Sequence, residues 1–111
     1  MKVYRLLTQE EWRETVDLLP LSAIDIRDGY IHLSTKEELL KTANLYFLQE
    51  EQLIIAAFES SIFGAHLKME YVASRNTSFP HLYQQKLRRE DIVEITRLRK
   101  QEEGFIWEEN I

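Results

Sequence analysis

Two of the three histidines of the chain stand in its two most distinctive segments. His32 and Ser34 belong to residues 28–35, which read DGYIHLST and lie between an Asp-Gly turn and the expected start of a helix. His81 belongs to residues 79–83, FPHLY, next to a proline that restricts the backbone. An imidazole can donate, accept or carry a proton near neutral pH. These two segments are therefore the first candidates for a ligand site.

The composition excludes several other kinds of chemistry. The chain has no cysteine, which rules out disulfides, thiolate catalysis and cysteine-based zinc sites. The histidines and carboxylates match no familiar metal-ligand spacing, such as two histidines one helical turn apart, so no metal site is predicted. Ser34 lacks the strained, glycine-flanked turn of a serine hydrolase nucleophile. Oxygen and imidazole chemistry remains.

Size and charge favour a small soluble domain. A chain of 111 residues with 44% apolar and 30% charged residues is expected to form one domain, residues 1–111. No apolar run reaches the roughly 18 residues of a membrane span and no signal core begins the chain, so we expect a cytoplasmic protein without a membrane partner. A net charge of −5 argues against nucleic acid as a partner. The sequence does not indicate an oligomeric state.

A strand and a capped helix are expected at the start of the chain. Residues 3–7 are predicted to form the strand, and residues 8–11, TQEE, fit a capping box, so a helix should begin at Gln9. It should continue until Pro20, which removes a backbone donor. The buried side of this helix would consist of Trp12, Val16 and Leu19.

A connection, a strand and a second helix should follow. Residues 20–29 are expected to be a connection closed by the Asp-Gly turn, and residues 30–33 a short strand. Residues 34–37, STKE, predict a second capping box with Ser34 as the N-cap, where free backbone N–H groups would also suit a phosphate. The buried side of the second helix would consist of Leu39, Leu40, Ala43, Tyr46 and Phe47.

The second half of the chain reads mainly as strands. Residues 52–58 predict a buried strand and residues 67–72 its neighbour in the same sheet, joined by a turn. Residues 74–83 are rich in polar and turn residues and predict a long surface loop that would carry the FPHLY motif. Residues 92–98 predict a further strand, and residues 105–107 a last strand or a packed terminus. Two early helices and mostly late strands favour an α+β domain with a mainly antiparallel, curved sheet.

Over residues 2–98 the chain resembles a small bacterial family called domain of unknown function 952. The resemblance rests on the DGYIHLST and FPHLY motifs together, supported by the opening strand and Trp12. Members of that family look like compact relatives of the ADP-ribosyltransferase fold, which also includes the RNA 2'-phosphotransferases. The resemblance therefore implies a compact ADP-ribosyltransferase-like fold for this chain.

The same resemblance implies a set of ligand-binding residues. In the wider fold the first strand offers a histidine or an arginine to ribose or phosphate, and a second strand offers a serine or another histidine. Carried onto this chain, these positions are Arg5, where the family usually has histidine, and His32 with Ser34. An arginine keeps the donor but does not titrate near neutral pH.

The remaining implied positions lie later in the chain. His81 and Tyr83 would border the same cleft, and Glu70 would supply the catalytic acid beside a catalytic His32. The family commonly has a tryptophan before this glutamate and a glycine after the tyrosine, where this chain has Met69 and Gln84. The wall next to the acid and the backbone path after the motif should therefore differ from the family pattern.

Each of these residues also has a purely structural interpretation. Arg5 would then be a strand residue paired with a carboxylate, His32 a histidine held by a backbone carbonyl, and His81 a loop residue that stiffens its turn. Asp25 and Asp28 are interpreted as turn formers, although Asp28 stands close enough in sequence to orient His32.

The leading hypothesis is a small enzyme, or degenerate enzyme, of ADP-ribosyltransferase type that binds a nucleotide or another phosphate-bearing ligand. NAD is a candidate substrate, with ADP-ribose as a related ligand; no cofactor is indicated. The alternative is a non-catalytic module that binds a small anion or a peptide, favoured if Glu70 points away from the cleft. A third hypothesis is RNA 2'-phosphate processing. A shared site requires Arg5, His32 and His81 to lie within about 15 Å of one another.

Overall fold

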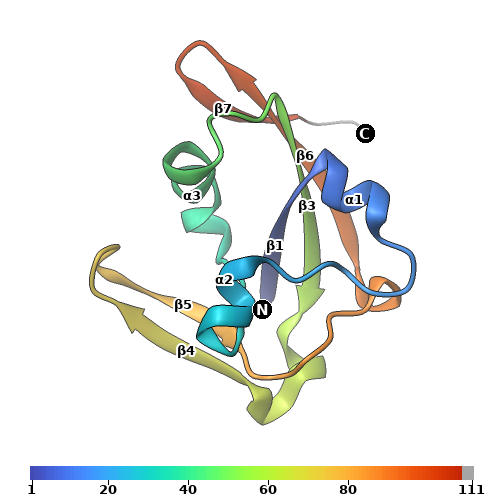
Figure 1. Cartoon of the computed structure of the whole chain (residues 1–111). Helices are drawn as coiled ribbons and strands as arrows, with labels where there is room; N and C mark the ends of the chain where they lie inside the picture. Colours follow the sequence, from blue (N-terminus) through green and yellow to red (C-terminus); the bar gives the residue numbers. More distant parts are fainter. Residues whose placement is uncertain (109–111) are drawn as a thin grey trace.

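The computed structural model describes residues 1–108, which form two antiparallel sheets with helices around them (Figure 1). The larger sheet has the strand order β1-β3-β6-β7 and the smaller one β2-β5-β4. The strands are β1 (Lys2–Thr8), β2 (Ile31–His32), β3 (Gln52–Glu59), β4 (Leu67–Val72), β5 (Thr77–Leu82), β6 (Glu94–Gln101) and β7 (Gly104–Glu108). The α+β antiparallel architecture is confirmed, but the strands form two sheets where one was expected.

The described residues contain three α-helices where two were expected. These are α1 (Gln9–Glu14), α2 (Ala23–Asp28) and α3 (Lys36–Tyr46), accompanied by two 3-10 helices, η1 (Ser60–His66) and η2 (Arg89–Asp91). None of the helices in residues 1–108 has the length and apolar character that a membrane crossing requires.

The large sheet is built around β3, which was correctly predicted as a buried strand. Residues 53–58 are all buried, and the strand pairs with β1 on one side and β6 on the other. Because successive side chains of β3 point to opposite faces of the sheet, the strand contributes to two separate hydrophobic cores. Ile54, Ala56 and Phe58 face the smaller sheet, whereas Leu53, Ile55 and Ala57 face α3. The small sheet and α3 therefore pack on opposite faces of the large sheet.

Helix α1 begins where the sequence indicates but ends early. The capping box is present, with Glu11 N–H donating to the Thr8 hydroxyl (3.1 Å) and Thr8 N–H donating to the Glu11 carboxylate (2.9 Å). The prediction that the helix reaches Pro20 is wrong, because Thr15 is already extended and Val16 is exposed. The next residues pair instead with a distant segment, since Leu19 N–H donates to the carbonyl of Leu87.

Helix α2 lies where a connection without an element was predicted. Ser22 and Asp25 form a capping box, with Asp25 N–H donating to the Ser22 hydroxyl (3.1 Å) and Ser22 N–H donating to the Asp25 carboxylate (2.9 Å). Gly29 ends the helix at a φ of 81°, which glycine adopts without a steric penalty. The helix is six residues long and buries Asp25 rather than an apolar residue, so it has no hydrophobic periodicity to detect.

Helix α3 starts one residue later than predicted. Thr35 is the N-cap, so the assignment of Ser34 as N-cap is wrong. The Ser34 hydroxyl donates to the carbonyl of Thr35 (3.0 Å), and its backbone exchanges two hydrogen bonds with Tyr4 of β1. This pairing holds Ser34 in extended structure. Tyr46, expected to be buried, is exposed.

Two predictions about the smaller sheet are wrong. β4 pairs with β5 and not with β3, because η1 intervenes and carries the chain to the other sheet. Residues 77–82 of the predicted surface loop form β5, with its last four residues buried. Pro80 is tolerated there because its backbone faces β2, where its carbonyl accepts from Leu33 N–H (3.1 Å). The last two strands, β6 and β7, are confirmed.

Candidate functional site

The two histidine motifs meet at the centre of the smaller sheet. His32 on β2 lies directly opposite His81 on β5, and their ring centroids are 5.6 Å apart. Arg5, on β1 of the other sheet, donates from Nη1 to the carbonyl of His32 (2.8 Å). These three residues therefore lie well within the separation that a shared site requires.

Arg5 forms a buried ion pair with Asp25. The Nη2 atom lies 2.6 Å from Asp25 Oδ2, and the two residues are 6% and 3% exposed. The guanidinium also donates to the carbonyls of His32 and Pro20, so four of its five N–H groups are engaged. Arg5 thus holds Asp25 and joins the two sheets.

Asp25 in turn holds both the backbone and the ring of His32. Its Oδ1 accepts from the backbone N–H of His32 (3.0 Å) and lies 2.8 Å from His32 Nδ1. Burial alone would raise the pKa of Asp25, but the hydrogen bonds from His32 and Arg5 outweigh it and hold that pKa well below the usual aspartate range. Asp25 is therefore an ionised anchor and not the turn former that the sequence suggested.

Asp28 contacts the second ring nitrogen of His32. Its Oδ2 lies 3.0 Å from His32 Nε2, as the short sequence separation suggested. The Arg27 guanidinium, and after it His32, lowers the pKa of Asp28. His32 thus stands between two carboxylates, an arrangement in which both ring nitrogens donate when the imidazole is a cation. About a third of its side chain is exposed.

His81 belongs to a second carboxylate pair. Its Nδ1 lies 2.8 Å from Glu70 Oε1, and the same oxygen accepts from the Tyr83 hydroxyl (2.6 Å). The bond from Tyr83, followed by that from His81, lowers the pKa of Glu70 and raises the pKa of Tyr83 to about 12. Glu70 is therefore an ionised acceptor that fixes the His81 ring.

Tyr30 is, after Asp25, a second site residue that sequence reasoning missed. Its ring stacks on His81, with centroids 4.2 Å apart and an interplanar angle of 28°. The same ring lies 4.6 Å from His32 and 5.2 Å from Tyr83. The position of Tyr30 within the DGYIHLST motif was the available signal, but its role depends on the pairing of β2 with β5, which was not predicted.

A hollow of about 510 Å³ opens beside this aromatic cluster. Tyr30 and Tyr83 form part of its wall, with Asp25 also on its surface. The exposed aliphatic side chains of Leu21 and Ile26 line it as well. Ser34 is not among its lining residues; it is buried nearby in sequence with its hydroxyl turned to Thr35. The hollow thus combines ring surfaces and aliphatic groups.

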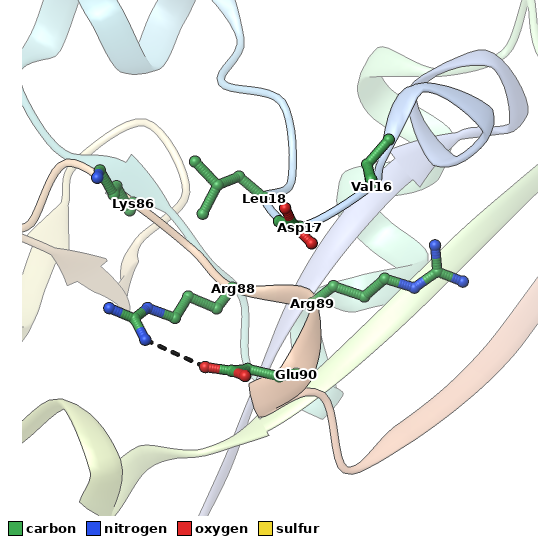
Figure 2. Close-up of a pocket in the computed structure, with 7 residues that line it drawn as sticks. All are labelled: Val16, Asp17, Leu18, Lys86, Arg88, Arg89 and Glu90. Carbon is green, nitrogen blue, oxygen red and sulfur yellow. Dashed lines mark hydrogen bonds and ion pairs between the residues drawn. The ribbon is translucent and has the colours of Figure 1, made fainter.

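A second hollow, of about 570 Å³, lies between residues 16–18 and the basic residues Lys86, Arg88 and Arg89 (Figure 2). Its charges are largely engaged. Arg88 pairs with Glu90 at 3.1 Å, and Arg89 stacks on the Trp12 ring and donates to the carbonyl of Thr15. Because these arginines already have partners, this hollow is a poor candidate for a phosphate site.

Residues 1–108 contain no group of three or more histidine or carboxylate side chains arranged to hold a metal ion.

Comparison with known proteins places the chain in a family. Residues 6–95 match the family described as Protein of unknown function (DUF952). The chain belongs to this family. No curated protein matches the sequence.

Solved structures of one relative share the fold. The X-ray structure of Protein CC0527 from Caulobacter crescentus, a structural genomics target, is 30% identical, with a TM-score of 0.83 over 95% of this chain and 92% of that protein. The solution NMR structure of the same protein is 29% identical, with a TM-score of 0.74 over 94% of this chain and 90% of that one. The DUF952 resemblance is thus confirmed, while the further likeness to ADP-ribosyltransferases stays a prediction.

Proposed function

We propose that this DUF952 chain binds a nucleotide-type ligand at the paired histidines and acts on it by proton transfer. The observation that carries the proposal is the side-by-side placement of two carboxylate-held imidazoles, His32 with Asp25 and His81 with Glu70, next to an open hollow. A carboxylate that fixes one ring nitrogen sets the tautomer. At His81 this leaves Nε2 to exchange a proton, whereas at His32 Asp28 lies against the second nitrogen.

The walls of the hollow suit the sugar and ring of such a ligand better than its phosphates. Tyr30 and Tyr83 offer ring surfaces for stacking. Arg5 is buried and already neutralised by Asp25, so it offers no free charge to a phosphate. We therefore assign Arg5 a positioning role and place phosphates of the ligand toward solvent.

Roles follow for the pair formed by His81 and Glu70. His81 would exchange a proton through Nε2, since Nδ1 faces Glu70. Glu70 would also stabilise positive charge developing at a ribose, as a catalytic acid in an ADP-ribosyltransferase-like site would. Glu70 does not line the hollow, and the preference for an enzyme over the non-catalytic binding module rests on its contact with His81. RNA 2'-phosphate processing is disfavoured by the net charge and by the engaged arginines of the second hollow.

Thermal unfolding with added ligands tests the proposal. NAD, ADP-ribose, nucleoside 2'-phosphates and simple anions would be compared on wild type, His32→Ala and His81→Ala. At a hundred times its dissociation constant a bound ligand adds about 2.7 kcal/mol of stability. We expect NAD or ADP-ribose to stabilise the wild type and to lose this effect in both variants.

His66→Ala is the matched control, because His66 is exposed and outside the cluster. It should keep the full ligand effect. If no nucleotide stabilises the wild type while His32→Ala and His81→Ala lower stability by themselves, the histidines are structural and the proposal fails.

A further inference from the structure

Strand β4 forms an edge of the smaller sheet. Within residues 1–108 it is paired through β5 alone, and Figure 1 shows it at the outer rim of the molecule. An edge strand presents N–H and C=O groups that another strand can pair with. The question is which groups β4 presents and what they fit.

The outward backbone groups of β4 can be identified from Pro80. In an antiparallel pair, two opposite residues either bond to each other or both turn away. Pro80 lies opposite Met69, and its carbonyl bonds to Leu33 on the β2 side. The N–H and C=O of Met69 therefore face the free edge, and alternation gives the same direction to Leu67 and Tyr71.

The side chains of β4 are self-complementary about Met69. Residues 67–71 read LKMEY, so a positive and a negative residue flank the methionine on one face of the strand. In an antiparallel pair centred on Met69, Lys68 stands opposite the partner's Glu70. On the other face Met69 meets its own symmetry mate, and Leu67 meets the partner's Tyr71. Met69 and Tyr71 are 49% and 63% exposed in the single chain.

We propose that β4 pairs with β4 of a second copy of this chain, antiparallel and centred on Met69, to form one sheet through both subunits. Met69 and its mate would exchange backbone hydrogen bonds. The pair formed by Lys68 and the partner's Glu70 would then be of the non-hydrogen-bonded type, in which opposite side chains approach most closely. Charges on an edge strand usually prevent such pairing; here opposite signs align and attract.

The pairing would also reach the candidate site. Glu70 accepts from His81 and Tyr83, so the partner's Lys68 would bring a second cation to the carboxylate that orients His81. The inference does not depend on the proposed function, because it rests on the strand edge alone.

Sedimentation equilibrium tests the pairing. A six-residue strand buries less than the roughly 1,200 Å² of a stable interface, so we expect a dimer that forms only between micromolar and millimolar concentration. Lys68→Glu places like charges opposite each other and should weaken the dimer at least tenfold. Adding Glu70→Lys to that variant should restore it. Lys86→Glu, with the same charge change on an exposed residue away from β4, should have no effect.

Met69→Pro provides a test independent of charge. The substitution removes an N–H that faces outward, so the β4–β5 ladder and the folded monomer should survive, as circular dichroism would show, while the dimer is lost. In the wild type the amides of Leu67, Met69 and Tyr71 should exchange more slowly as concentration rises. A protein that stays monomeric at millimolar concentration, or a dimer that survives both Lys68→Glu and Met69→Pro, would overturn the proposal.

Discussion

At the scale of single residues, the site depends on Asp25 more than on the histidines themselves. This one side chain accepts from Ser22 N–H in the capping box of α2, pairs with Arg5 and holds both the backbone and the ring of His32. The sequence located His32 and His81 through their motifs, and it correctly related Asp28 to His32. It did not reveal Asp25, because an aspartate in the middle of a predicted connection looks like any turn former.

Asp25→Asn should therefore be strongly destabilising at neutral pH. It leaves the buried Arg5 without its counter-charge, which typically costs about 3 to 5 kcal/mol. Since the pKa of Asp25 is lower in the folded protein than in the unfolded chain, its contribution is complete above the ordinary aspartate pKa and is lost as pH falls below it.

Urea unfolding at several pH values would measure this effect. The stability gap between wild type and Asp25→Asn should be widest at pH 7 and shrink by about 1.4 kcal/mol per pH unit below about pH 3.9. Asp17→Asn, at an exposed aspartate, should show little gap. A gap for Asp25→Asn that is the same at pH 7 and pH 3 would contradict the assigned ionisation.

At the scale of elements, local signals predicted where structure starts better than where it ends. The capping box at Thr8 fixed the start of α1, but its end is set by the pairing of Leu19 with Leu87, almost seventy residues away in sequence. β5 was missed because Pro80 suggested a loop, although the direction of its backbone within the sheet makes it harmless. Both errors concern long-range pairing, which a single sequence does not display.

The end of α2 offers a test that isolates backbone conformation. Gly29 has a φ of 81°, and a Cβ added there would meet no atom within 4 Å. Gly29→Ala should therefore cost only the left-handed conformational penalty, about 1 kcal/mol in the free energy of unfolding. Gly29→Asn should cost less, because asparagine tolerates this region. Chemical denaturation of both variants would compare them; equal losses for alanine and asparagine would mean that another contact is involved.

At the scale of the whole molecule, buried polar groups of the candidate site connect the two sheets. The Ser34 backbone pairs with Tyr4, and the Arg5 guanidinium on β1 reaches Asp25 and His32. Hydrophobic patterning predicted the strands, but not their division between two sheets, because an alternating strand fits either partner. Arg5 and Ser34, which the sequence suggested as ligand-binding residues, thus hold the two sheets together.

Arg5→Lys should weaken the connection between the two sheets more than it weakens the large sheet itself. A lysine keeps the charge but lacks the planar fork that contacts Asp25, Pro20 and His32 together. Hydrogen exchange should show faster opening for amides of β2 and β5, while the buried amides of β3 continue to exchange only with global unfolding. The Lys2→Arg variant, changed at an exposed position on the same strand, should leave both sheets unaffected. If Arg5→Lys lowers the protection of β3 as much as that of β5, the two sheets unfold as one unit and Arg5 is not a separable link between them.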